Sequence, residues 1–142
     1  MEELAQFRQW NSPTPGHPEV DIMRGVENTS GPLGQGHTYA VGAAIAAKFL
    51  KARFGEVMSQ TIYAYISDGS VEEEISQGVG RIAGHLGLSN FVMYYDSNNI
   101  QLSTKVDEVM TENVAMKYEA WGWNVLSIDG HNINEIREAL VA

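Results

Sequence analysis

Two runs of β-branched and aromatic residues constrain the fold of this chain most strongly. The first covers residues 61–66 and the second residues 91–95, and a polar turn ends each run. Residues of these types favour strands, so both runs are predicted to be strands. The acidic residues 72–74 open a segment between them that repeats apolar side chains at helical spacing. A helix between two strands is typical of a parallel sheet with helical crossovers.

The remaining segments continue this alternation. Small apolar residues between 36 and 55 predict a helix that packs closely on a sheet, and residues 112–120 and 133–141 predict two further helices. Residues 123–128 predict a third strand. The pattern predicts an α/β fold with three α/β/α layers around a mainly parallel sheet. We expect residues 1–142 to form a single domain that binds its ligands beyond the carboxyl ends of the strands.

The composition disfavours several kinds of partner. The chain has 18 acidic and 9 basic side chains, a net charge of -9 and no cysteine. This balance, without a Lys/Arg cluster, disfavours nucleic acids and anionic membranes as partners. A metal would need oxygen or imidazole ligands, which favours magnesium or calcium. Because the sequence has no apolar run of bilayer length and no secretory signal at its start, we expect a cytoplasmic protein.

Two polar residues directly follow the predicted strands, Asp68 after the first and Asn98 after the second. If the strands are neighbours, both side chains face one pocket. A carboxylate, an amide oxygen and a nearby carbonyl such as that of Ile100 suit Mg²⁺ and leave positions open for a diphosphate. The alternative is that both segments only form tight turns and helix caps. Their recurrence at successive strand ends favours the metal site.

Two loops before the first strand carry further candidates. The segment Gly31–Gly36 contains three glycines and precedes a helix, so its backbone can approach a ring or a phosphate while Leu33 presents an apolar surface. The alternative is that these glycines serve only a sharp turn and close packing. His17 lies in a proline-rich loop that could orient it to donate to a substrate hydroxyl or to shuttle a proton. Taken alone, such a histidine is more often a surface or packing residue.

Four motifs, taken together in order and spacing, resemble the transketolase family. They are Thr14–Glu19, Gly31–Gly36, Ser67–Gly69 and Asp96–Ile100. The last two are similar to the thiamine-diphosphate fingerprint, which is usually Gly-Asp-Gly followed by an asparagine at a later strand end. Ser67 departs from the first glycine of that fingerprint, and Asn99 stands where glycine is common, although asparagine tolerates a left-handed turn well. Neither departure removes a metal ligand.

The resemblance implies a cofactor site for thiamine diphosphate and Mg²⁺. The residues that would hold the metal are Asp68, Asn98 and, through its carbonyl, Ile100. The residues that would contact the cofactor are Gly31, Leu33, Gly69, Asp68 and Asn98.

The resemblance also implies an activity. Transketolases transfer a two-carbon ketol unit between sugar phosphates. His17 would contact the ketose donor near its reacting end, and Glu73 would help couple the active sites across a homodimer. A complete family subunit also has a pyrimidine-binding and a C-terminal domain, which we expect to be absent from residues 1–142, so the chain would need a pyrimidine-domain chain for turnover. The alternatives are a non-catalytic or regulatory remnant of the fold, or a component of a deoxyxylulose-phosphate synthase or a phosphoketolase.

Overall fold

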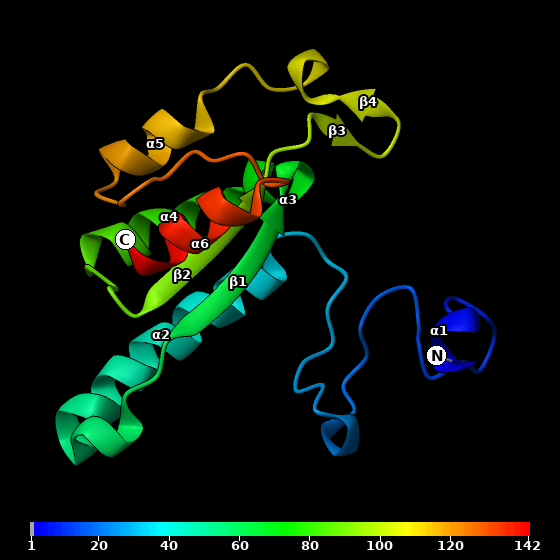
Figure 1. The fold of residues 1–142 in the computed structure, drawn as a ribbon, viewed down its shortest axis with the longest axis horizontal. Helices are drawn as coiled ribbons and strands as arrows, with labels where there is room; N and C mark the ends of the chain where they lie inside the picture. The colour runs from blue at the N-terminus through cyan, green and yellow to red at the C-terminus, as the bar shows by residue number, and fades with distance from the viewer. Residues whose placement is uncertain (1) are drawn as a thin grey trace.

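Two parallel strands form the centre of the molecule. The computed structural model describes residues 2–142, whose course is shown in Figure 1. Strand β1, Ile62–Ser67, pairs in parallel with β2, Phe91–Asp96, and the register sets Ser67 opposite Asp96. The prediction of two neighbouring parallel strands is confirmed, and both polar turns lie at the same edge of the sheet. A short antiparallel hairpin follows β2, formed by β3, Ile100–Gln101, and β4, Thr104–Lys105.

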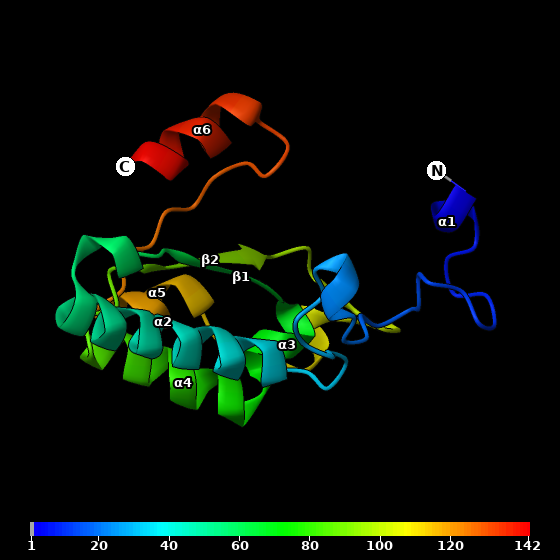
Figure 2. The ribbon, with the colours of Figure 1, turned by 90° about the horizontal axis from the view of Figure 1, so that it is seen from below.

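Helices lie on both sides of the parallel strands. Figure 2 shows α2, α4 and α5 on one side of β1 and β2, with α6 on the other, as the predicted α/β/α layering requires. None of the helices among residues 2–142 is long and apolar enough to cross a membrane. The α-helices are α1 Glu2–Ala5, α2 Gln35–Phe54, α3 Asp68–Glu72, α4 Glu74–His85, α5 Val114–Ala120 and α6 Ile133–Val141, and the 3₁₀ turns are η1 Ile22–Arg24, η2 Glu56–Met58 and η3 Val106–Glu108.

The predicted third strand is wrong. Residues 123–128 take no part in either sheet. The Trp123 indole N–H donates to the carbonyl oxygen of Gly80 at 2.8 Å, and its backbone N–H donates to the carbonyl oxygen of Tyr118 at 3.1 Å. This segment is therefore anchored to α4 and α5. A pattern of strand-favouring side chains reports their packing and cannot show whether a partner strand lies beside the backbone.

The helix predicted to open at residues 72–74 begins earlier and is interrupted. Helix α3 starts at Asp68, directly after β1, and ends at Glu72. Glu73 has an extended backbone, with φ −62° and ψ 131°, and α4 starts at the next residue. The interruption separates a short helical turn at the strand end from the longer helix that packs beside α2 (Figure 2).

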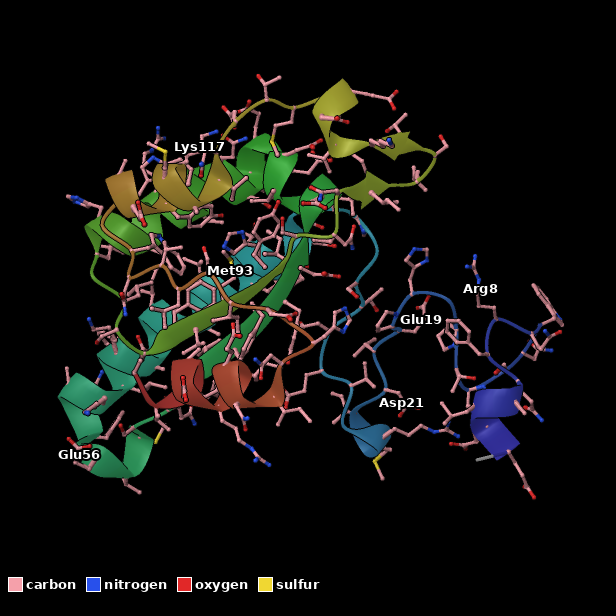
Figure 3. The ribbon with its side chains drawn as sticks, turned by 45° about the horizontal axis from the view of Figure 1, so that its top comes forward. Arg8, Glu19, Asp21, Glu56, Met93 and Lys117 are labelled. Carbon is pink, nitrogen blue, oxygen red and sulfur yellow. The ribbon has the colours of Figure 1, made fainter. Side chains whose placement is uncertain are left out.

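The core lies between the sheet and the helices on its covered face. Met93, labelled in Figure 3, packs against both clusters of buried residues. Small side chains on α2 let that helix approach the sheet closely, as predicted. The first cluster consists of Val41, Ala44, Ala83 and Phe91, and the second of Ile66, Val71 and Tyr118.

Helix α4 approaches the end of α5 most closely at Gly84. A Cβ atom at this position would lie 2.0 Å from the carbonyl oxygen of Trp121. The obstacle is backbone, so it cannot turn aside as a flexible side chain would. Gly78, on the same helix, has no heavy atom within 4 Å of the corresponding position.

We expect Gly84→Ala to lower the free energy of unfolding by about 3 kcal/mol, because overpacking forces the backbone to shift. Gly78→Ala is the matched control and should raise it by up to about 1 kcal/mol through helix propensity. Urea denaturation of both variants measures the difference. Equal effects of the two substitutions would contradict the close approach at Gly84.

His37 is a buried histidine in the first turn of α2. It is 5% exposed, and its ring centroid lies 6.1 Å from that of Phe91. Neither ring nitrogen has a hydrogen-bond partner among residues 2–142. Burial lowers the pKa of His37 from 6.5 to about 4, because the charged imidazolium would be poorly solvated.

This depressed pKa predicts a loss of stability in mild acid. Between pH 6.5 and about pH 4 the unfolded chain takes up a proton at His37 and the folded chain does not, so the free energy of unfolding falls as the pH falls. The contribution is at most about 3 kcal/mol. Urea denaturation from pH 7 to pH 4 measures the free energy of unfolding, which should depend less on pH in His37→Leu than in the wild type. Equal pH dependence in the two proteins would contradict this prediction.

Candidate functional site

Asp68 joins the carboxyl ends of the two strands. It starts α3 directly after β1, and it is 1% exposed. Its Oδ2 accepts the backbone N–H groups of Asn98 at 3.1 Å and Asn99 at 2.9 Å, and its Oδ1 accepts the hydroxyl of Tyr95. The structure therefore brings the two polar turns together around one buried carboxylate.

Tyr95 is a partner of Asp68 that the sequence analysis missed. Burial raises the pKa of Tyr95 above its ordinary value, and the hydrogen bond to Asp68 raises it further. The hydroxyl therefore remains protonated and serves as a donor to the carboxylate. The signal in the sequence was the predicted pairing of the two strands, whose parallel register places Tyr95 opposite Ile66, two residues before Asp68.

Asn98 is held in the turn after β2 by its own side chain. Its Nδ2 donates to Asp96 at 3.1 Å, and its Oδ1 accepts the backbone N–H of Ile100 at 3.0 Å. Asn99 has φ 62°, which is the left-handed conformation expected from its type. These bonds fix the side-chain amide of Asn98, and its backbone N–H is bonded to the buried Asp68 carboxylate.

The glycine-rich loop lies against the start of α3. A Cβ atom at Gly69 would lie 3.6 Å from Cδ1 of Leu33. A Cβ atom at Gly34, which has φ 79°, would lie 2.7 Å from Cγ2 of Ile75, so only glycine fits there. Leu33 and Gly69, predicted from separate motifs, are therefore neighbours.

His17 is brought to the other end of the same loop. A Cβ atom at Gly31 would lie 3.6 Å from Cγ and Cδ2 of the His17 ring. The backbone N–H of Ser30 donates to the carbonyl oxygen of Pro18 at 2.9 Å, which ties the two loops together. His17 itself is exposed. Its imidazole is therefore accessible to a ligand, while one edge of the ring lies beside Gly31.

The proline-rich loop is ordered by contacts within the N-terminal segment. The Thr14 hydroxyl donates to the carbonyl oxygen of Glu3 at 2.7 Å, and the backbone N–H of Arg8 donates to the carbonyl oxygen of Thr14 at 2.9 Å. The Arg8 side chain crosses Gly16, where a Cβ atom would lie 3.0 Å from its Nε. Figure 3 shows this segment, with Arg8 and Glu19 labelled, beside the main body.

Glu73 is not brought to Asp68. It is exposed at the break between α3 and α4, and its Cβ lies 3.2 Å from the Cβ position of Gly34. Its carboxylate forms no hydrogen bond or ion pair with any of residues 2–142. It therefore borders the glycine-rich loop from outside the strand-end site.

Comparison with known proteins decides the family. A family model described as the thiamine diphosphate binding domain of transketolase matches residues 1–142. The chain belongs to the transketolase family. The transketolase of Geobacillus stearothermophilus is 44% identical over 145 residues, and transketolase 1 of Escherichia coli (strain K12) is 46% identical over 145 residues. Each match covers 99% of this chain and 22% of the relative, so the chain spans about a fifth of their length.

Solved transketolase structures share the fold of this transketolase domain. A transketolase from Campylobacter jejuni matches with a TM-score of 0.92 and 46% identity. A transketolase from Pichia stipitis, solved in complex with sedoheptulose 7-phosphate, matches with a TM-score of 0.91 and 34% identity. Each match covers 99% of this chain and 22% of the other. These matches confirm the predicted α/β fold of the thiamine-diphosphate-binding type.

The oxygen atoms at the strand ends of this transketolase domain fit a magnesium ion. A carboxylate has about four lone-pair positions, and Asp68 accepts three hydrogen bonds, which leaves one. Asn98 Oδ1 has two lone pairs, and among residues 2–142 it accepts only the N–H of Ile100. With a backbone carbonyl such as that of Ile100, these atoms form a hard oxygen set that leaves octahedral positions for phosphate and water. No group of three or more His, Asp or Glu residues in the described chain could hold a metal instead.

We expect Tyr95→Phe to lower the free energy of unfolding by about 1–2 kcal/mol, because a buried carboxylate loses a charge-assisted hydrogen bond. The control is Tyr94→Phe, at the preceding position of β2. The Tyr94 hydroxyl forms no side-chain hydrogen bond with residues 2–142, so this change should be close to neutral. Chemical denaturation of both variants distinguishes them, and equal losses would argue against the Tyr95–Asp68 bond.

Proposed function

We propose that this chain provides the diphosphate- and metal-binding half of a transketolase active site. The observation that carries the proposal is the buried Asp68 carboxylate, which binds the backbone of Asn98 and Asn99 across two adjacent strand ends. Family membership supports thiamine diphosphate as the cofactor. The free lone pairs of Asp68 and Asn98 support a divalent cation as its partner.

In this proposal the strand-end residues bind the charged end of the cofactor. Asp68, Asn98 and the carbonyl of Ile100 hold Mg²⁺. Gly69 contacts the diphosphate through its backbone at the start of α3. Metal coordination neutralises the diphosphate without a basic side chain.

The loops before α2 bind the rest of the cofactor and the sugar. Leu33 and Gly31 line the thiamine site, and the exposed imidazole of His17, packed against Gly31, donates to a hydroxyl of the ketose donor near its reacting end. Glu73 lies outside this constellation and helps couple two active sites across a homodimer. Leu33 from the glycine-rich loop and His17 from the proline-rich loop thus border the place where the cofactor and the sugar would react.

The proposed reaction is transfer of a two-carbon ketol unit between sugar phosphates. Thiamine diphosphate, when bound, supplies a carbanion that acts as nucleophile and electron sink. The residues of this chain bind, orient and shield the reactants. The chain spans 22% of the length of these relatives. In this proposal the other parts of the site therefore come from a second subunit of a homodimer or from a pyrimidine-domain chain. A cytoplasmic location remains a prediction.

Calorimetric titration with thiamine diphosphate, with and without Mg²⁺, tests the proposal. We expect binding to the wild-type chain only with Mg²⁺. Asn98→Ala keeps the backbone N–H that binds Asp68, so it should fold normally and weaken the Mg²⁺-dependent binding by at least about 10-fold. Asp68→Ala should abolish binding, since it removes the carboxylate ligand.

Glu119→Ala is the control, because it removes an exposed carboxylate in α5, a helix that belongs to neither strand-end turn. It should bind as the wild type does. Circular dichroism establishes that each variant is folded before titration. A folded wild-type chain that fails to bind with Mg²⁺ would contradict the proposal and favour a non-catalytic remnant of the fold.

A further inference from the structure

Helix α3 contacts the turn after β2 at two places, one helical turn apart. Asp68 and Glu72 stand at positions i and i+4 of this helix, so their side chains share one face. Asp68 accepts the backbone N–H groups of Asn98 and Asn99. Glu72 Oε1 accepts the side-chain amide of Gln101 at 2.6 Å. The segment that carries Asn98 and Ile100 is therefore held at both of its ends.

The second contact is a strong hydrogen bond in partly buried surroundings. Glu72 and Gln101 are both half-buried, and the bond joins an amide N–H to a carboxylate, which is shorter and stronger than a bond between neutral groups. No basic side chain pairs with Glu72 in the described part of the chain. Glu72 therefore directs its carboxylate to Gln101.

The bond also fixes which way the Gln101 amide faces. An ionised carboxylate only accepts hydrogen bonds, so the Nε2 group of Gln101 must face Glu72. The carbonyl Oε1 then lies 3.7 Å from the Cβ position of Gly69, and Cβ of Gln101 lies 3.9 Å from it. Gln101 thus lies, like Leu33, within 4 Å of the Cβ position of Gly69 at the start of α3.

We propose that Glu72 and Gln101 form a second clamp that positions the metal-binding turn, so that Asn98 and Ile100 are in place before Mg²⁺ binds. Asp68 ties the turn to α3 at residues 98 and 99, whereas Ile100 is bonded to Asn98 and pairs in the β3–β4 hairpin, and neither contact joins it to α3. Gln101 follows Ile100 directly and fixes the far end. The inference rests on the proposed function for the metal-binding role of the turn.

Hydrogen exchange in the cofactor-free chain tests the clamp independently of cofactor binding. The backbone N–H groups of Asn98 and Asn99 are bonded to Asp68, and that of Ile100 is bonded to Asn98 Oδ1, so their exchange reports opening of the turn. We expect Gln101→Ala and Glu72→Ala to speed this exchange by about 10-fold, because either change releases one end of the turn. Glu72→Gln keeps an acceptor oxygen and should restore most of the protection.

Calorimetry with thiamine diphosphate gives the second measurement. The apparent Kd for Mg²⁺ should rise about 10-fold in each single variant, as is typical when a residue supporting a metal ligand is lost. The double variant Glu72→Ala/Gln101→Ala should bind Mg²⁺ no more weakly than either single variant, because both changes remove the same bond. If the Glu72–Gln101 bond only stabilised the fold, the variants would be less stable, but they would not lose affinity for Mg²⁺ to the same extent.

Glu74→Ala is the matched control, since Glu74 is an exposed carboxylate two residues away with no side-chain partner among residues 2–142. Faster exchange in the control equal to that of Gln101→Ala would overturn the clamp. Unchanged exchange in Gln101→Ala, or faster exchange with wild-type Mg²⁺ affinity, would also overturn it. A wild-type chain that binds no Mg²⁺ refutes the proposed function and with it the metal role, whereas the exchange data still decide whether the clamp holds the turn.

Discussion

The buried carboxylate of Asp68 is the interaction on which the strand-end site depends. Its three hydrogen bonds come from β2 and the turn that follows it, while its backbone begins α3 after β1. Burying a carboxylate this deeply without hydrogen-bond donors would cost free energy, so the three donors are as necessary to the site as Asp68 itself. The parallel register, which sets Ser67 opposite Asp96, is what brings donors and acceptor within reach.

Contacts at three glycines connect the strand-end site to the loops of the N-terminal segment. At Gly34 neighbouring side chains leave no room for a Cβ atom, whereas at Gly69 and Gly31 the neighbours lie at ordinary van der Waals distance from the Cβ position. At two of these positions the neighbour is itself a candidate residue, Leu33 at Gly69 and His17 at Gly31. The glycines therefore serve close packing and the candidate site at once, and the two interpretations of this loop are compatible.

The sequence predicted the strand pair, the main helices and the meeting of Asp68 with Asn98, because these follow from local patterns and from parallel topology. It failed at residues 123–128, where side-chain preference did not reveal that the backbone lacks a partner strand. It also missed Glu72 and Gln101. Their contact depends on α3 starting at Asp68, and three consecutive glutamates do not indicate that the helix breaks at the second of them.

The charge around the strand ends bears on the role of a cation in the proposed cofactor site. Asp68, Glu72 and Asp96 are all hydrogen-bonded within this region, and none of them has a basic partner in the described part of the chain. A diphosphate approaching these carboxylates without a metal would meet repulsion that partial burial strengthens. A divalent cation reverses that balance, because it attracts the carboxylate and the phosphate oxygens together. In the proposed site, the acids that repel a free diphosphate would therefore favour its magnesium complex.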